Sequence, residues 1–330
     1  MSEVMSVAQK RDPALLGPSD DLHVITANPA PPGASVTWIR TRDNLKLRVA
    51  RWRCGARSVG TVAILPGRAE FIEKYFEVVR ELLERNLDVV VLDWRGQGRS
   101  DRVLCDPGKC HVNDFRAYER DLEALCEQVL GPSCRKPWFA LGHSMGGALL
   151  LAHARERPAR FARLVLTAPM LDIHSKLLPY ALSFVPNVLA LLGLKTTLVP
   201  GGCREPYESA GLSGVVLTSD AGRLQRSLAV IKAAPELAVG DPTIGWVCAA
   251  RRFTRQFKSA GFARGILAPV LIVTGDQDSV VDTSAARRFA AQLRAGQFVS
   301  LPGAHHDILM EGDPIRARFW EAFDAFLAGR

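Results

Sequence analysis

Short apolar runs alternate with helical segments along most of this chain, and no other feature limits its fold so strongly. The expected strands are residues 61–65, 89–92, 138–141, 164–167, 270–274 and 298–301. The expected helices are residues 71–85, 115–129, 145–156, 285–293 and 314–327. Continuous apolar runs are typical of parallel strands that are buried on both faces. The alternation therefore predicts an α/β fold with a mostly parallel, doubly wound sheet.

An antiparallel hairpin is expected ahead of the parallel strands. Residues 36–39 and 45–49 have strand character and flank a turn at Arg42, Asp43 and Asn44. Before them, residues 1–33 carry charges and prolines but no apolar segment typical of a signal peptide. We therefore expect a flexible lead-in and, by default, a cytoplasmic protein.

The alternation is interrupted between residues 171 and 263, a stretch too long for a connecting loop. It begins with a nearly charge-free run, 177–194, which is long enough to span a membrane. Pro179 and Pro186 argue against one continuous span, so we favour a helical cap over the carboxyl edge of the sheet. The predicted organisation is a core of residues 34–170 and 264–330 with a cap or lid inserted at 171–263.

Charge and cysteine content restrict partners and compartment. The net charge of +8 is compatible with nucleic acid, an anionic membrane surface or solubility alone. The arginines are scattered and form no basic helix, which argues against nucleic acid and leaves weak peripheral contact with anionic lipid at the inner face of a membrane. The seven cysteines form no CxxC pair, so we expect free thiols, although Cys105 and Cys110 could pair across a loop. No cofactor or metal is expected.

A nucleophile-elbow pattern, G-x-S-x-G, occupies residues 142–146 and centres on Ser144. The bare pattern is weak, because chance alone would produce it in roughly one chain in ten of this length. Its position between an expected buried strand and an expected helix makes it specific. The sharp turn would project the serine hydroxyl above the sheet.

A nucleophilic serine needs a base, and the base needs an orienting carboxylate, in the chain order Ser, Asp or Glu, His. The loops after the last two expected strands supply candidates at the sheet's carboxyl edge. Asp276, Asp278 and Asp282 compete for the carboxylate, although Asp276 could be a turn residue and Asp282 a helix N-cap. His305 and His306 compete for the base.

The oxyanion hole should use two backbone N–H groups. One belongs to Met145, directly after the nucleophile. The other should come from the loop 66–70, where Arg68 is the expected donor through its main chain. His143, inside the elbow, is expected to pack beneath it.

Four motifs resemble one branch of a known family. They are GHSMGG at 142–147, LDWRGQGRSDR at 92–102, PGRAEFIEKY at 66–75 and GAHHDILME at 303–311. They are similar to the monoglyceride lipases and bacterial lysophospholipases among the α/β-hydrolases, also called serine aminopeptidase-like hydrolases. The likeness runs from about Ser35 to Leu327.

The resemblance implies a role for individual residues. The nucleophile falls on Ser144, the carboxylate on Asp278 and the base on His306, with Arg68 as the first oxyanion donor. Asp93 is implied to be structural. Pro66 and Gly67 stand where many members have His-Gly.

The resemblance also implies a serine hydrolase of carboxylic esters, a lysophospholipase or monoacylglycerol lipase that acts on a small monoacyl lipid. An acyltransferase or an amidase/aminopeptidase would use the same triad, and a non-catalytic binding scaffold is a further alternative. Within the cap, an acyl chain could contact Leu177, Leu178, Phe184 and Leu191, although these residues could equally pack the cap on the sheet.

Overall fold

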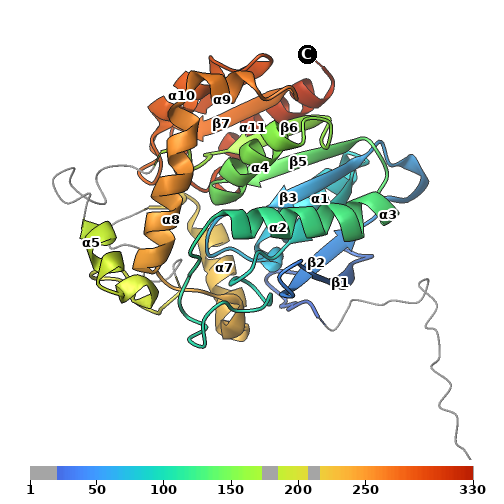
Figure 1. Cartoon of the computed structure of the whole chain (residues 1–330). Helices are drawn as coiled ribbons and strands as arrows, with labels where there is room; N and C mark the ends of the chain where they lie inside the picture. Colours follow the sequence, from blue (N-terminus) through green and yellow to red (C-terminus); the bar gives the residue numbers. More distant parts are fainter. Residues whose placement is uncertain (1–20, 173–184, 207–215, 330) are drawn as a thin grey trace, which may run out of the picture.

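A single eight-stranded sheet organises the computed structural model, which describes residues 21–172, 185–206 and 216–329 (Figure 1). Its strand order is β1-β2-β4-β3-β5-β6-β7-β8. The strands are β1 Ser35–Arg40, β2 Lys46–Trp52, β3 Thr61–Leu65, β4 Asp88–Leu92, β5 Trp138–His143, β6 Arg163–Thr167, β7 Val270–Gly275 and β8 Gly296–Leu301.

Strands β3 to β8 are parallel, whereas β1 pairs antiparallel with β2 and β2 pairs antiparallel with β4. The expected hairpin and the expected parallel sheet are both confirmed. Every residue of β3, β4 and β7 is buried, as continuous apolar runs require.

The strand register brings together the loops that follow the strands. Leu65 at the end of β3 pairs with Gly142 of β5, and Gly275 of β7 pairs with Leu301 of β8. The loop after β3 therefore starts beside the elbow, and the loops after β7 and β8 start beside each other.

Helices cover both faces of the sheet. The α-helices of the described residues are α1 Phe76–Glu84, α2 Arg116–Leu125, α3 Gly131–Ser133, α4 Met145–Glu156, α5 Val185–Leu191, α7 Ala221–Ala233, α8 Ile244–Thr254, α9 Ala260–Arg264, α10 Thr283–Ala290 and α11 Asp313–Leu327. Figure 1 shows α2 and α4 in front of the sheet, with α1 and α11 behind it. Arg85, directly after α1, pairs with Asp324 of α11 at 2.8 Å, which brings the end of α1 beside α11.

The segment expected as one helix over 71–85 is divided. Residues Ile72–Tyr75 form a 3-10 turn, and the α-helix begins only at Phe76. All four residues of the turn are buried, including Glu73 and Lys74. Their charged ends have fixed partners elsewhere in the protein, so tertiary contacts set the local geometry here.

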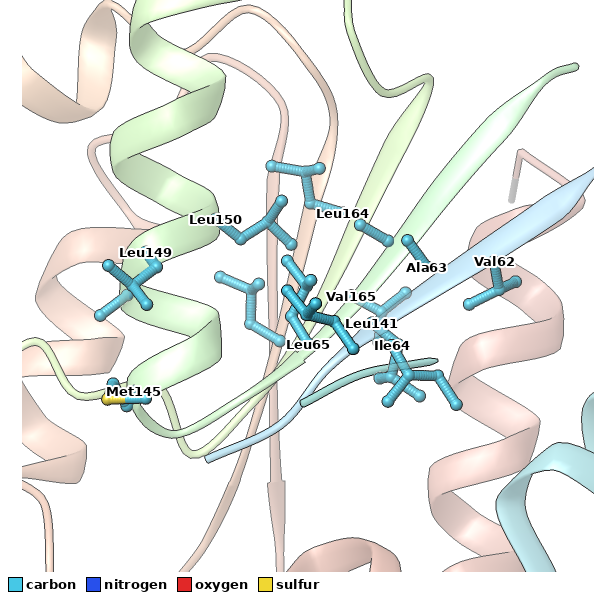
Figure 2. Close-up of a cluster of buried hydrophobic side chains, with 14 of the residues drawn as sticks. Val62, Ala63, Ile64, Leu65, Leu141, Met145, Leu149, Leu150, Leu164 and Val165 are labelled. Carbon is cyan, nitrogen blue, oxygen red and sulfur yellow. The ribbon is translucent and has the colours of Figure 1, made fainter. Parts of the chain in front are cut away.

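An apolar layer lies between α4 and the central strands (Figure 2). Leu150 of α4 points toward the strands, and Leu65 of β3 and Leu164 of β6 lie on the face of the sheet that α4 covers. All of these side chains are at most 1% exposed. This packing holds the end of β5 and the start of α4 in one rigid unit, which supports the elbow between them.

The described part of the lead-in packs against the body of the protein. Trp52 donates its indole N–H to the carbonyl of Pro31 at 3.0 Å, and the Asn28 side-chain amide donates to the carbonyl of Glu73 at 2.9 Å. Leu22 is only 7% exposed.

Helices α5, α7, α8 and α9 lie in the long connection between β6 and β7. In Figure 1, α5, α7 and α8 gather at one end of the sheet. A small apolar cluster joins α7 to the loop after β3 through Phe71, Val230, Ile231 and Leu237. Among residues 21–172, 185–206 and 216–329, no helix is long and apolar enough to cross a membrane. All seven cysteines are free thiols.

Candidate active site

Ser144 stands at a strained turn between β5 and α4. Its backbone has φ 48° and ψ −112°, a conformation that residues with side chains rarely adopt and that costs on the order of 1–3 kcal/mol. Hydrogen bonds hold the turn: the Ser144 N–H donates to the carbonyl of Thr167 at 2.9 Å, and the Met170 N–H donates to the carbonyl of Ser144 at 3.0 Å. The geometry is that of a nucleophile elbow.

Gly146 lets the elbow pack tightly against the loop after β3. A Cβ at this position would lie 2.1 Å from the carbonyl oxygen of Leu65 and 2.6 Å from that of Pro66. Both atoms belong to the backbone, so they cannot turn aside. Only glycine therefore allows the start of α4 to approach the loop 66–70 this closely.

Ser144, His306 and Asp278 form one hydrogen-bonded chain. The Ser144 hydroxyl lies 3.0 Å from His306 Nε2, and His306 Nδ1 lies 2.8 Å from Asp278 Oδ2. The three residues come from the ends of β5, β8 and β7. Asp278 is itself oriented by the N–H groups of Val280 and Val281, at 2.7 and 3.1 Å.

The competing candidates have other partners. Asp276 accepts a hydrogen bond from the Gly303 N–H at 2.7 Å, which makes it a turn residue. Asp282 is the N-cap of α10 and accepts from the N–H groups of Ser284 and Ala285. The structure therefore brings Asp278 and His306, and neither Asp276 nor Asp282, to Ser144.

The charges of the chain reinforce each other. Burial disfavours the charged form of His306, but the Asp278 carboxylate, with Asp307 and Glu70 farther away, raises the pKa of His306 above its usual value. Burial alone would raise the pKa of Asp278, but His306 and the N–H groups of Val280 and Val281 lower it. Asp278 therefore stays ionised and favours the imidazolium form of His306.

The two expected oxyanion donors lie on either side of the elbow. Met145 is the first residue of α4, where the N–H has no acceptor within the helix and the helix dipole favours negative charge. In the loop after β3, Gly67 donates its N–H to Glu70 and Ala69 donates its N–H to Gln97. These bonds set the backbone on both sides of Arg68, and Ala69 has a positive φ of 65°.

The side chain of Arg68 reaches the connection between β6 and β7. Its guanidinium donates to the carbonyl of Gly240 at 3.1 Å and lies 5.8 Å from the centre of the Trp246 ring. Contacts of this side chain therefore join the loop after β3 to the segment expected to be the cap.

Buried polar and charged residues surround the triad, and of these the sequence patterns singled out only His143. Lys74 lies 2.9 Å from Glu70 and 2.9 Å from Asp307, and His143 Nε2 lies 3.2 Å from Asp307. His143 also contacts Thr167 Oγ1 at 3.0 Å, and its ring centre lies 4.9 Å from that of His306. One signal in the sequence could have pointed to these residues: charged residues stand in the motifs that directly follow the expected buried strands.

A second ionic cluster supports the same loops from behind. Arg48 donates to both carboxylate oxygens of Glu73, at 2.7 and 2.8 Å, and to Asp93 at 2.7 Å. Asp93 also accepts from the N–H groups of Ile72 and Arg99, both at 2.9 Å. Arg48, Glu73 and Asp93 are fully buried, and burial raises the pKa of Asp93. These contacts fit a structural role for Asp93.

The predicted acyl contacts are only partly described. Leu177, Leu178 and Phe184 lie outside the described residues. Leu191, at the end of α5, is 87% exposed.

Among the described residues, one group of side chains has the spacing of a metal site. Single donor atoms of His143, His306 and Asp307 lie within 4.8 Å of one another. The ammonium group of Lys74 binds the same Asp307 carboxylate, and His306 is engaged by Ser144 and Asp278. A metal cation there would meet a positive charge at its carboxylate ligand, so the hydrogen-bonded arrangement fits this donor set better.

Comparisons with known proteins identify a similar family, similar proteins and similar structures. The sequence model of the family described as serine aminopeptidase, S33, matches residues 56–313. Lysophospholipase L2 of Escherichia coli K12 is 30% identical over 289 residues, which cover 83% of this chain and 82% of that protein. A monoacylglycerol lipase of Mycolicibacterium smegmatis is 27% identical over 255 residues, covering 76% and 82%.

A solved structure shows the same fold. It is a soluble variant of monoglyceride lipase from Saccharomyces cerevisiae in complex with a substrate analog. Its TM-score is 0.73 at 17% identity, and the match covers 94% of this chain and 98% of that one.

Proposed function

The chain belongs to the serine aminopeptidase S33 family of α/β-hydrolases, and on that basis we propose that it hydrolyses the ester bond of a small monoacyl lipid through an acyl-enzyme on Ser144. The observation that carries this proposal is the hydrogen-bonded chain from Ser144 through His306 to Asp278, with separations of 3.0 and 2.8 Å. It supplies a nucleophile, a base and an orienting carboxylate in the required order.

In the proposed first step, His306 Nε2 takes the proton of the Ser144 hydroxyl while its oxygen attacks the ester carbonyl. The carbonyl oxygen becomes an oxyanion that the N–H groups of Met145 and Arg68 stabilise. His306 then donates the proton to the leaving alcohol, and the acyl group remains on Ser144. Asp278 keeps the imidazole in the tautomer that presents Nε2 to the serine and stabilises its charged form.

In the second step, His306 takes a proton from water, whose oxygen attacks the acyl-enzyme. A second tetrahedral intermediate collapses, the carboxylic acid leaves, and the proton returns to Ser144. The buried position of the site supports this chemistry, because Ser144 is 8% exposed and His306 is 5% exposed. Electrostatic stabilisation is strongest where water is excluded.

The identity of the substrate rests on the relatives. The named relatives are a lysophospholipase and a monoacylglycerol lipase, and the chain covers 82% of each. We therefore propose a monoacyl lipid as the substrate, with either a glycerol or a phosphodiester head group.

A panel of monoacyl lipids tests this proposal. Lysophosphatidylcholine, lysophosphatidylethanolamine and monoacylglycerol of several chain lengths are each incubated with the wild-type protein and with Ser144→Ala. We expect fatty acid release from at least one lipid and a loss of about 10⁴-fold or more in the variant. Release that survives in Ser144→Ala would refute the mechanism. Acyl transfer to added glycerol or lysolipid in place of release would identify an acyltransferase.

We also propose that α5 and the turn after it touch an anionic membrane surface. Leu191 at the end of α5 and Leu192 in the turn after it are 87% and 69% exposed, which is unusual for adjacent leucines in a folded protein. Two cations are exposed in the same part of the connection between β6 and β7: Lys195 in the turn after α5, and Arg252 near the end of α8, the helix that packs against α5. Apolar side chains flanked by cations fit an anionic lipid interface.

Vesicle flotation tests the membrane proposal. The pair Leu191→Asp and Leu192→Asp should reduce binding to phosphatidylglycerol vesicles, while hydrolysis of a soluble short-chain ester is retained. Val59→Asp is the matched control, because Val59 is 60% exposed but precedes β3 at the opposite end of the strand from the elbow. Equal binding by the wild-type protein, the double variant and the control would exclude this surface. A cytoplasmic location is proposed as well, since the seven free thiols fit a reducing compartment.

A further inference from the structure

Asp307 is a buried carboxylate beside the triad that the proposed mechanism does not use. It directly follows His306 and is 6% exposed. Its two oxygens have separate partners: Oδ2 lies 2.9 Å from Lys74 Nζ, and Oδ1 lies 3.2 Å from His143 Nε2. The backbone N–H of Asp307 donates to the carbonyl of Leu217 at 2.8 Å.

Lys74 connects Asp307 to the loop after β3. Its ammonium group also lies 2.9 Å from Glu70 Oε1, and the other Glu70 oxygen accepts from the Gly67 N–H and from the Tyr75 hydroxyl. Gly67 immediately precedes the proposed oxyanion donor. A continuous path of charged contacts therefore runs from the loop that holds the base to the loop that holds the oxyanion donor.

Asp307 is also close enough to act on His306 directly. One donor atom each of His143, His306 and Asp307 lie within 4.8 Å of one another. Burial alone would raise the pKa of Asp307, but Lys74 and His143 lower it, so the carboxylate is ionised at neutral pH. His306 thus has a second negative charge nearby, in addition to Asp278.

We propose that Asp307 is a positioning residue of this site, which ties the base loop to the oxyanion loop through Lys74 and Glu70 and provides His306 with a second carboxylate. The inference rests on the proposed function, and it assigns no bond-making step to Asp307. The ionisable groups around His306 include Asp278, Asp307, Glu70 and His143, and Lys74 is held against Asp307.

The pH dependence separates this role from simple packing. The carboxylates of Asp278, Asp307 and Glu70 raise the pKa of His306 against the opposing effect of burial. His306 must be neutral to accept the serine proton, so activity is lost as pH falls through this pKa. Removing the charge of Asp307 should therefore move the acid limb of the kcat/KM profile to lower pH, by roughly one pH unit for a charge at this range.

The test compares Asp307→Asn with three other variants on a soluble short-chain ester. Asp307→Asn should move the acid limb down and lower kcat at the plateau about tenfold or more, with little change in KM. Asp307→Glu keeps the negative charge, so the acid limb of its kcat/KM profile should stay at the wild-type pH. Lys74→Met breaks the same path without removing a carboxylate and should lower kcat with little change in KM. Asp276→Asn is the matched control, because Asp276 is an exposed carboxylate that supports the base loop through Gly303, and its limb should not move.

NMR titration of the His306 ring in the Ser144→Ala background gives a second readout that needs no turnover. Relative to Ser144→Ala alone, the pKa of His306 should fall when Asp307→Asn is added and should stay unchanged when Asp276→Asn is added. This measurement tests the effect of Asp307 even if the wild-type protein cleaves no ester, so the two proposals fail independently. An unchanged acid limb and an unchanged His306 pKa in folded Asp307→Asn would overturn the inference. If that variant does not fold, an unchanged kcat in Lys74→Met would overturn it.

Discussion

Replacing Gly146 by alanine should damage the proposed oxyanion hole without removing any polar group. The added Cβ would lie 2.1 Å from the carbonyl oxygen of Leu65 and 2.6 Å from that of Pro66. Relieving these contacts requires the start of α4 and the loop after β3 to separate by about 1 Å, a misplacement that can cost roughly 10²-fold in rate. The Met145 and Arg68 N–H groups lie on the two segments that separate. Overpacking of this kind also lowers the free energy of unfolding by about 1–3 kcal/mol.

The assay is kcat/KM on a soluble ester, together with a urea unfolding curve. Gly147→Ala is the matched control: it lies one residue farther into α4, and a Cβ there would meet its nearest atoms at 3.1 Å, so shifts of a few tenths of an ångström relieve it. In a helix, alanine is itself favoured over glycine by about 1 kcal/mol, so any loss of stability in either variant is steric. A kcat/KM within threefold of wild type for Gly146→Ala would refute the reasoning.

Three further predictions concern the charged groups. Asp278→Asn should lower kcat by about 10⁴-fold, as a wrong histidine tautomer would, and kinetics at the plateau pH with a circular dichroism check of folding would measure it. In the wild-type protein, the raised pKa of His306 predicts that kcat/KM falls as pH decreases through a value above 6.5, the ordinary histidine pKa; an acid limb below 6.5 would contradict this. Arg48→Met leaves Glu73 and Asp93 buried without their cation and should lower the free energy of unfolding by about 3–5 kcal/mol, measured by urea unfolding, with Arg53→Met as an exposed control.

The central strands were predictable because burial on both faces produces continuous apolar runs in the sequence. The expected strand at 61–65 and the expected helix at 145–156 coincide with β3 and α4. The segment 71–85 was less predictable, because the geometry of Ile72–Tyr75 follows from distant partners of Glu73 and Lys74. Apolar spacing carries no information about such contacts.

In the candidate site, too, local features could be predicted from the sequence, whereas contacts between distant residues could not. The elbow at Ser144 and the N-cap role of Asp282 are local and could be anticipated from neighbouring residues. The residues alone could not separate Asp278 from Asp276, because the difference lies in which carboxylate faces His306. The partnership of Lys74 with Asp307 joins residues 233 positions apart, and no local pattern could reveal it.

Trapping the acyl-enzyme tests the central claim most directly. The wild-type protein is mixed with the best monoacyl lipid of the panel, quenched in acid within milliseconds, digested and examined by mass spectrometry. The account predicts that the peptide containing Ser144 gains the mass of the fatty acyl group, and that Ser144→Ala shows no such adduct. An acyl group on another residue, or steady hydrolysis by Ser144→Ala, would contradict it.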